Sequence, residues 1–347
     1  MHSGEQRWSR VQFRHSSLRS LRLRRCTPRV YVRPPGGDGP RSLRPVLAFL
    51  VVSHRNPRQV LRLVRTLREG SGVDVLVHHD QRTEPIDPAE CRRAGGRLVH
   101  YGLRVEWGNV AYTEMLLRAL ADLAESSDPD WIAVASGQDY PLRPLADFER
   151  HLAESPHQAL LRDLWELDLS REPGSAQREF YLRYRYHHYA PPRPLAAMLA
   201  RALGRRAYLR ELPGGLGLRL GVRPRTHPFG PTLRCHVSSD WLTLERSAVH
   251  AVLEFTRANT AVMRHYRRTI IPSESLFATV LANDPTISIG PASRFFGFEA
   301  GSPHPRTLTS ADLEALVASG MHFARKFDEA VDAQVLDLLD EFRARVA

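Results

Sequence analysis

Strand-length apolar runs alternate with amphipathic helical segments through the first half of this chain, and that alternation restricts the folds open to it. The apolar runs are residues 46–52, 74–79, 97–101 and 131–135. Between them, residues 57–69 and 111–126 place apolar side chains three and four positions apart, as one face of a helix does. Strands that alternate with helices form βαβ units. We therefore expect an α/β fold with a largely parallel, Rossmann-type sheet flanked by helices.

The second half of the chain has a less regular pattern. Residues 170–235 are rich in Arg, Tyr, Gly and Pro, and we expect them to form irregular connections around one helix near residues 195–203. The later elements that we expect are a strand near residues 241–244 and helices at 247–259, at 273–282, around Leu313 and around Val335.

The positive charge of the chain is concentrated in residues 1–44. The whole sequence has a formal net charge of +11, yet residues 1–44 hold eleven arginines against Glu5 and Asp38, a balance of +9 that leaves about +2 for the rest. The near-neutral remainder does not favour a nucleic-acid partner. We expect residues 1–44 to be a disordered basic extension, with contact to RNA or to an anionic membrane surface as open alternatives.

Neither a membrane span nor a secretory signal is expected from this sequence. The longest apolar run, residues 46–52, is far shorter than the roughly 20 residues that a membrane helix needs. Residues 1–30 carry many arginines and no apolar core. We therefore expect a cytoplasmic protein, and peripheral contact with the inner face of the membrane through the basic extension stays open.

Two residue types exclude further classes of site. Cys26, Cys91 and Cys235 are odd in number and far apart, so they predict neither a zinc site nor a disulfide framework. Lys326 is the only lysine among 49 basic residues, and no GK[ST] sequence is present. A Walker-A phosphate loop is therefore excluded.

Four segments carry a resemblance to a known family. They are LVVSHRNP at 50–57, WIAVASGQDYPL at 131–142, SSDWLTLER at 238–246 with IPSESLFAT at 271–279, and FARKFD at 323–328. In this order they resemble glycosyltransferase family 14, which contains the core-2/I-branching β-1,6-N-acetylglucosaminyltransferases and the peptide O-xylosyltransferases. The resemblance spans nearly all of the chain that follows the basic extension.

This resemblance implies a GT-A-like fold and an inverting, metal-independent glycosyltransferase. Such an enzyme moves a sugar from a UDP-sugar donor to an acceptor hydroxyl and forms a β-glycosidic bond. The expected sugar is N-acetylglucosamine or xylose, the acceptor is a glycan, a protein or a small molecule, and no cofactor is expected. The resemblance also implies one domain over residues 45–347, with a nucleotide-binding half at 45–155 and an acceptor and diphosphate half at 156–347.

Two departures from the family pattern bear on these expectations. The family usually has a glycine where Ser238 stands, which keeps a non-catalytic sugar-binding relative open as a hypothesis. Eukaryotic members have many cysteines and a membrane anchor, so we expect a bacterial-type member. A nucleic-acid-binding protein that acts through its basic extension is the third hypothesis.

Glu274 is the candidate catalytic base. Ser273 and Glu274 follow Pro272 and also suit the start of a helix, where a serine caps the helix and a glutamate complements its dipole. The resemblance favours the catalytic role, because the family's base occupies this position. Inverting transfer needs one carboxylate to take the proton of the attacking hydroxyl.

Lys326 and Arg306 are the candidate cations for the donor diphosphate, because both match family residues that bind it. Positive charge held in place beforehand stabilises the diphosphate as it departs. Arg325 precedes Lys326, and sequence reasoning does not separate these two neighbours.

A single acid stands where many GT-A enzymes carry the two acids of a metal-binding DxD motif. That acid is Asp139, within Gly-Gln-Asp after the strand at 131–135. The literal match, Asp128-Pro-Asp130, comes before this strand, at the end opposite to the expected ligand crevice. We interpret Asp128 and Asp130 as turn residues and expect no metal site.

Further candidates are expected in the crevice beyond the carboxyl ends of the strands. His54, Asp80 and Asp139 follow three of the strands and are interpreted as contacts to the nucleotide or the donor sugar. Two alternatives stay open: His54 is an ordinary turn histidine, and Asp139 orients the turn that follows its strand. The candidates for acceptor or sugar binding are Trp107, Tyr112, Ser239, Trp241, Arg183 and Arg185. The two arginines project together if their segment is extended, and a solvated surface is the alternative.

Overall fold

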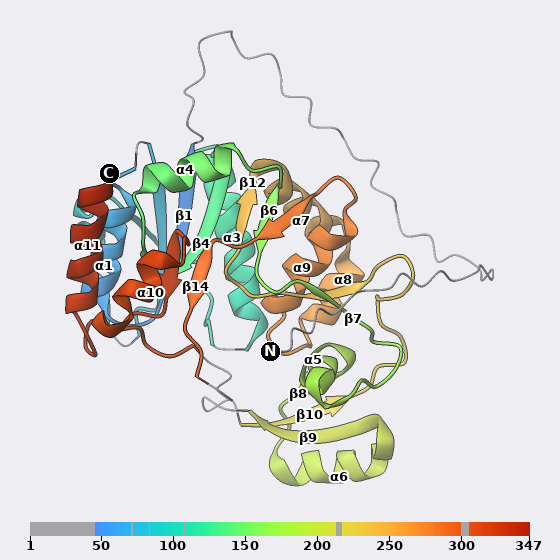
Figure 1. Cartoon of the computed structure of the whole chain (residues 1–347). Coiled ribbons are helices and arrows are strands. Elements are labelled where there is room, and N and C mark those ends of the chain that lie inside the picture. Colours follow the sequence, from blue (N-terminus) through green and yellow to red (C-terminus); the bar gives the residue numbers. More distant parts are fainter. Residues whose placement is uncertain (1–45, 71, 83, 107, 213–216, 300–304) are drawn as a thin grey trace, which may run out of the picture. The chain divides into compact units, whose positions relative to one another are not determined.

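A seven-stranded sheet forms the centre of the structure, in the order β13-β6-β12-β4-β1-β2-β3 (Figure 1). The structure is a computed structural model that describes residues 46–347 except 71, 83, 107, 213–216 and 300–304. The strands of the sheet are β1 (Leu47–Ser53), β2 (Asp74–His79), β3 (Arg97–Val99), β4 (Trp131–Ser136), β6 (Ala159–Leu161), β12 (Thr243–Glu245) and β13 (Ile289–Pro291).

Most neighbours in this sheet are parallel. β1 pairs in parallel with β2 and β4, β2 with β3, and β6 with β13, whereas β12 runs antiparallel to both β4 and β6. The expected α/β fold with a largely parallel sheet flanked by helices is therefore confirmed. β6, β12 and β13 belong to the predicted second half of the domain, so the two predicted halves share one sheet.

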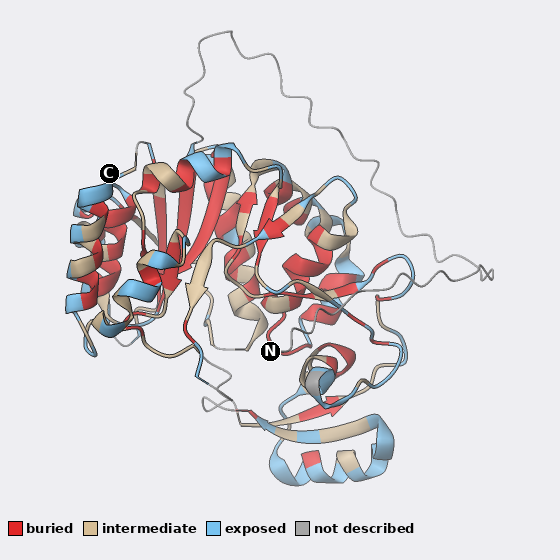
Figure 2. Ribbon diagram, viewed as in Figure 1, coloured by how far each residue is buried: buried red, intermediate tan, exposed pale blue. Residues whose placement is uncertain are grey.

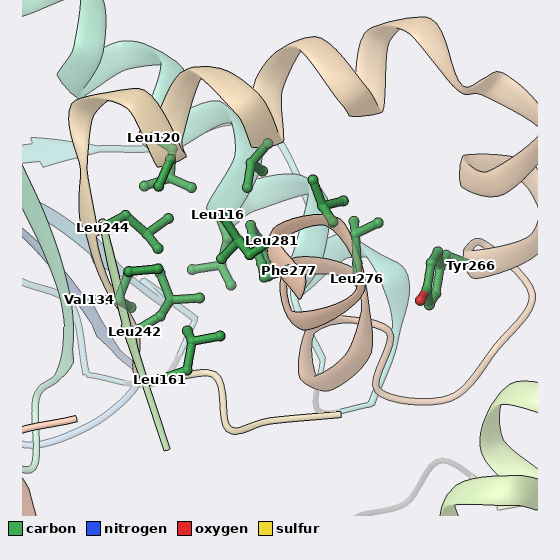
Figure 3. Close-up of a cluster of buried hydrophobic side chains, with 14 of the residues drawn as sticks. Leu116, Leu120, Val134, Leu161, Leu242, Leu244, Tyr266, Leu276, Phe277 and Leu281 are labelled. Atoms are coloured by element: carbon green, nitrogen blue, oxygen red, sulfur yellow. The ribbon is translucent and has the colours of Figure 1, made fainter. Parts of the chain in front are cut away.

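Alternate residues of β1 face two different apolar cores, because successive side chains of a strand point to opposite faces. Leu50 packs into the first core, with α3 (Val110–Ser126), α7 (Arg246–Ala258) and α9 (Ser273–Asn283). Phe49 and Val51 pack into the second, with α1 (Pro57–Leu67), α2 (Pro88–Arg93), α4 (Leu145–Ala153), α10 (Leu313–Ala318) and α11 (Gln334–Val346). Figure 2 shows the buried strands between exposed helix surfaces, and Figure 3 shows part of the first core.

The order β3-β2-β1-β4 creates a switch point between β1 and β4, where the chain begins to add strands on the other side of β1. Open α/β sheets bind ligands at the carboxyl ends of the strands at such a point. Gly137, just after β4, donates its backbone N–H to Val52. A Cβ atom at Gly137 would lie 2.7 Å from Ser53 Cβ and from Val60 Cγ2, so only glycine permits this close approach.

Three smaller sheets surround the central one. The first joins β14 (Arg294–Phe296), β15 (Phe323–Arg325) and β5 (Asp139–Pro141), and the second joins β7 (Trp165–Leu167) and β11 (Cys235–Val237). The third contains β8 (His187–Tyr189), β10 (Gly217–Val222) and β9 (Ala207–Leu212). The other described elements are α5 (Ser175–Arg185), α6 (Arg193–Leu203), α8 (Thr260–Tyr266) and the short 3₁₀ turns η1 (Gly204–Arg206) and η2 (Ser310–Asp312).

The expectation for residues 170–235 was wrong in its detail. The helix predicted near 195–203 is present as α6, but the segment also forms α5 and the strands β8, β9 and β10 rather than irregular connections. The expected disorder of residues 1–44 lies outside the described residues. No helix in the described part of the chain is long and apolar enough to cross a membrane.

Candidate active site

Glu274 lies in the first turn of α9, and its carboxylate is oriented by an arginine from a different helix. Arg183 of α5 donates from Nη1 to Glu274 Oε2 at 2.7 Å and from Nε to Glu179 Oε1 at 2.9 Å. Ser273 does not cap α9 with its side chain. The Glu274 side chain keeps 29% of its exposure, which leaves the carboxylate accessible to a ligand.

A second carboxylate, Asp240, lies beside Glu274. Asp240 belongs to the loop between β11 and β12, and Ser273 hydrogen-bonds its side chain. Within the described part of the chain, its buried Oδ1 atom has no hydrogen-bond partner. Burial and the charge of Glu274 raise the pKa of Asp240 to about 7. Burial also raises the pKa of Glu274, while the Arg183 guanidinium opposes that rise.

The pKa values of both acids are raised, but an arginine contacts only Glu274, so the negative charge of the pair is favoured on Glu274. Arg183 contacts Glu274 at hydrogen-bond distance and therefore favours the ionised form of this carboxyl group. Asp240 lacks such a contact and retains its proton up to neutral pH. The pair therefore offers one proton acceptor and one proton donor, an arrangement suited to acid–base chemistry.

Asp240 was missed by the sequence reasoning, which selected its neighbours Ser239 and Trp241. The available signal was an acid flanked by a serine and a tryptophan within a recognised motif. Its burial against α9 is a tertiary property that spacing does not reveal. The Ser239 hydroxyl is also buried and has no hydrogen-bond partner among the described residues.

Trp241 supports two guanidinium groups. The Arg325 guanidinium carbon lies 4.1 Å from the centre of the Trp241 ring, and that of Arg294 lies 5.8 Å from it. Arg325 also donates from Nη1 to Ser136 Oγ at 3.1 Å. Trp241 therefore serves as a platform for these cations, which differs from its predicted role as a contact to the acceptor or the sugar.

Lys326 is the more available of the two neighbouring cations. Its side chain is partly exposed, and its ammonium forms no hydrogen bond or ion pair with the residues that the structure describes. Its backbone carbonyl accepts a hydrogen bond from Leu308 N at 2.8 Å, which fixes the backbone of the segment. Arg325 is held by Trp241 and Ser136, so Lys326 is better placed to meet an added anion.

Arg306 is already paired in this structure. Its guanidinium makes a two-pronged contact with Asp312, and Nη1 to Oδ2 measures 2.8 Å. Its backbone N–H donates to Gly297 O, which places it on the segment that leads into η2. A diphosphate contact at Arg306 requires the guanidinium to share or leave Asp312.

Asp139 is fully buried, which excludes a direct contact with the donor sugar and agrees with the alternative that it orients the turn. Its Oδ1 atom lies 3.1 Å from Arg294 Nε, and its Oδ2 atom accepts from Ser136 Oγ at 2.6 Å. Arg325 Nη1 lies 3.8 Å from the same carboxylate. Asp139 therefore positions the turn after β4 and the arginine that covers Trp241.

The loops after β1 and β4 are tied to the segment that carries Lys326. Asp328 accepts from Arg55 Nη2 and from Asn56 Nδ2, both at 2.8 Å. Gln59 donates to the carbonyls of Gly137 at 2.8 Å and Phe327 at 3.1 Å. The switch point of the sheet and the segment after β15 thus share one edge, as a nucleotide diphosphate site requires.

His54 and Asp80 stand at the same edge, after β1 and β2. His54 is exposed. Asp80 accepts from Arg82 Nη2 at 2.6 Å, and the Arg82 hydrogen bonds lower the pKa of Asp80 to about 2. Asp80 is therefore a stable carboxylate, and Arg82 contacts both of its oxygens.

Among the other candidates for acceptor binding, Tyr112 at the start of α3 lies within electrostatic range of Asp240 and Glu274, and burial raises its pKa. Trp107 lies outside the described residues. The expected joint projection of Arg183 and Arg185 was wrong, because the segment is helical and residues two apart on a helix face different sides. Arg185 is buried near Tyr181 and Arg223, away from Glu274.

The literal DxD match lies at the amino end of β4, as predicted. Asp130 accepts from Val46 N at 2.9 Å, and Arg246 forms ion pairs with Asp128 and Asp130. The two acids therefore organise the turn that enters the strand. In the part of the chain that the structure describes, no three His, Cys, Asp or Glu side chains are grouped as a metal site would require.

Comparison with known proteins supports a glycosyltransferase relationship. No family model matches the chain. The chain is 25% identical to human xylosyltransferase 2 over 330 residues, which cover 87% of this chain. It is 23% identical to the xylosyltransferase oxt of Drosophila melanogaster over 324 residues, which cover 85% of this chain. It spans about a third of the length of these relatives, 34% and 33%.

A solved structure, the apo form of mouse xyloside xylosyltransferase 1, overlaps 80% of this chain and 97% of its own with a TM-score of 0.33 and 9% identity. The sequence similarity to the human and Drosophila melanogaster xylosyltransferases makes the chain a distant relative of these proteins, which supports a glycosyltransferase.

Proposed function

We propose that this protein is an inverting glycosyltransferase of the core-2/I-branching and xylosyltransferase family. It transfers a sugar from a UDP-sugar to an acceptor hydroxyl and forms a β-glycosidic bond without a bound metal. The observation that carries this proposal is the Glu274–Asp240 pair, with Arg183 on Glu274 and with the Arg325–Lys326 cations beside the switch point. Xylose is the first donor sugar to test, because the relatives are xylosyltransferases, and N-acetylglucosamine is the second.

The proposed step is a single displacement at the anomeric carbon of the donor. The acceptor oxygen forms a bond to that carbon while the bond to the diphosphate oxygen breaks, and its electron pair leaves with UDP. The proton of the acceptor hydroxyl passes to the Glu274 carboxylate. Because the diphosphate is a good leaving group once its charge is balanced, the step needs one base and no paired acid.

Two further residues support this chemistry. Lys326 balances the charge that grows on the departing diphosphate, and its ammonium has no competing contact among the described residues. Asp240, protonated up to neutral pH, donates a hydrogen bond to a hydroxyl of the sugar or the acceptor and keeps a second negative charge away from the base.

The test measures donor binding and UDP release with UDP-xylose and UDP-N-acetylglucosamine in parallel. We expect one donor to raise Tm and to yield UDP. Glu274→Gln keeps the size of the side chain but removes the base, so kcat should fall by about 10²–10⁴ while donor affinity changes little.

The matched control is Glu179→Gln, since Glu179 contacts the same arginine from the other side. Its turnover should stay close to that of the native protein. Native-like turnover of Glu274→Gln would return Glu274 to the role of a helix-start carboxylate. Donor binding without UDP release in both arms would favour the non-catalytic sugar-binding relative.

A further inference from the structure

Helix α6 is apolar on both its inner and its outer face. The inner side carries the buried Ala196 and packs against β9 and β10. The outer side presents Leu195, which is 41% exposed, and Met198, which is 60% exposed, together with Ala197 and Ala202. Apolar side chains that gather on the uncovered side of a helix indicate that protein or lipid covers that side. The small sheet covers only one side of α6 (Figures 1 and 2).

Exposed apolar side chains concentrate around this helix. Nine large hydrophobic side chains are exposed among the described residues, and five of them fall between residues 189 and 209. These five are Tyr189, Leu195, Met198, Leu203 and Leu209. Scattered single residues of this kind need no explanation, but a cluster marks a surface that binds something. We call the surface formed by residues 193–206 the α6 surface.

The charge of this segment indicates what it binds. Residues 190–210 contain five arginines and neither Asp nor Glu. Arg193 pairs with Glu211 at 3.0 Å and Arg210 with Glu179 at 2.6 Å. The other three, which are exposed and form no ion pair with any described residue, are Arg201, Arg205 and Arg206.

We propose that the α6 surface binds the surface of an anionic phospholipid bilayer. Leu195 and Met198 enter the boundary between headgroups and acyl chains, and Arg201, Arg205 and Arg206 contact lipid phosphates. Helices that combine apolar side chains with arginines bind in this way, through buried apolar area and attraction to anionic lipid. Contact with a second copy through the same surface is disfavoured, because a two-fold axis would bring arginines of both copies together.

Vesicle sedimentation of the full chain tests this proposal, with vesicles of phosphatidylcholine alone or mixed with phosphatidylglycerol. We expect binding to the mixed vesicles that is weakened roughly 10²-fold by the triple change Arg201→Ser, Arg205→Ser and Arg206→Ser, because each arginine near an anionic surface contributes roughly fivefold. Leu195→Glu with Met198→Glu should weaken binding as well. The matched control is Arg58→Ser, Arg65→Ser and Arg92→Ser, three exposed arginines of α1 and α2.

All of these variants keep residues 1–44 unchanged, so a contribution from the basic extension is the same in each. Equal loss in the control variant, or native binding by the α6 variants, would overturn the proposal. A loss of oligomeric mass in the Leu195 and Met198 variant, with vesicle binding retained, would identify a second copy as the occupant instead.

A fluorophore attached at position 198 reports contact with the bilayer directly, without a variant that weakens binding. Met198→Cys, combined with Cys26→Ser, leaves one accessible thiol because Cys91 and Cys235 are buried. An environment-sensitive fluorophore at this position should shift to shorter wavelength with mixed vesicles and not with phosphatidylcholine alone. The same fluorophore at Arg58→Cys should stay unchanged. Absence of a shift at position 198 while the protein sediments with the vesicles would overturn the proposed contact.

Discussion

The Arg183 guanidinium donates to the Glu274 carboxylate at 2.7 Å, although the two residues are 91 positions apart in the sequence. Burial raises the pKa of Glu274, and this guanidinium is the largest influence in the opposite direction. The base proposed here therefore depends on a residue from α5, a helix that the sequence did not predict. Arg183 is therefore a positioning residue, and its removal should change the pH dependence of activity.

Arg183→Gln should move the acid limb of the kcat/KM profile to higher pH by about one to three units, the usual effect of losing an opposite charge at contact distance. Removal of the guanidinium raises the pKa of Glu274, so the base is protonated over a wider range and activity recovers as pH rises. Arg183→Lys should restore part of the shift. Arg210→Gln, which removes a partner of Glu179 and leaves the Arg183–Glu274 contact, is the control.

A uniform loss of activity at every pH in Arg183→Gln would show a structural role only. The pH profile separates a structural role from a role in setting the pKa of Glu274. A packing defect lowers activity at every pH and does not follow the protonation of Glu274.

Asp240→Asn should stabilise the protein relative to the native sequence, increasingly so as pH rises from about 4 to 7. The pKa of Asp240 is raised in the folded state to about 7, from an ordinary value of 3.8. Above 3.8 the unfolded chain releases this proton while the folded protein retains it, so the native stability contribution is lost as pH rises. Asparagine removes that loss. Urea unfolding at several pH values measures the difference in the free energy of unfolding.

Asp163→Asn is the control for this measurement, because the Asp163 side chain is 71% exposed. Its effect should not change with pH across the same window. A pH-independent effect of Asp240→Asn would mean that Asp240 is ionised in the folded protein and that the proposed division of roles with Glu274 is wrong.

The parts of the fold that sequence reasoning recovered are those with local periodicity. β1, β2 and β4 are apolar runs of strand length, and α1 and α3 have one buried stripe, so each is visible without its neighbours. β5, β14 and β15 have three residues each and exist only because they pair with one another, β5 with β15 across more than 180 positions and β14 with β15 across 29. Such pairing leaves no pattern within any of the three segments.

The residues of the candidate site also fall into two groups, those that the sequence identified and those that only the structure revealed. Glu274 and Lys326 were reached through the family resemblance; Glu274 forms a pair with Asp240, and Lys326 precedes Phe327, which Gln59 ties to the loop after β4. Asp139 was assigned to the donor sugar or to the turn because it follows a strand, and its burial beside Arg294 of β14 leaves only the turn. Asp240 was overlooked because its raised pKa results from burial against α9. The environments of Asp139 and Asp240 are both set by burial against residues far away in the sequence. In its local sequence, neither acid differs from an ordinary acid in a turn.

Transfer should survive excess EDTA. The expected position of a metal-binding acid pair holds only Asp139, which is fully buried and lies 3.1 Å from Arg294 Nε. The positive charge that neutralises the diphosphate then comes from Lys326 and the neighbouring arginines. UDP release is to be measured with EDTA and after addition of Mn²⁺. Loss of turnover with EDTA and its return with Mn²⁺ would contradict this prediction.

Lys326→Ala should weaken UDP binding and slow transfer, by roughly 10²-fold or more in kcat, since negative charge gathers on the diphosphate as the bond to the sugar breaks. Lys326→Arg should recover only part of the loss, because a planar guanidinium does not reproduce the geometry of a compact ammonium. Arg325→Ala is the informative comparison. It removes a group stacked on Trp241 at 4.1 Å, so a fall in Tm should accompany any loss of activity, whereas Lys326→Ala should leave Tm without ligand unchanged.

Amine labelling gives an independent measurement of the same contact, because Lys326 is the only lysine of the sequence and the amino terminus serves as the internal reference. Saturating UDP should slow modification of Lys326 and leave the amino terminus unaffected. Bound UDP protects Lys326 from the reagent when its diphosphate covers the ammonium. An effect on the fold at a distance from Lys326 does not cover this group. Equal labelling with and without UDP, in a preparation that binds UDP, would make Lys326 an ordinary surface lysine. The diphosphate contact would then have to come from Arg306 after its release from Asp312.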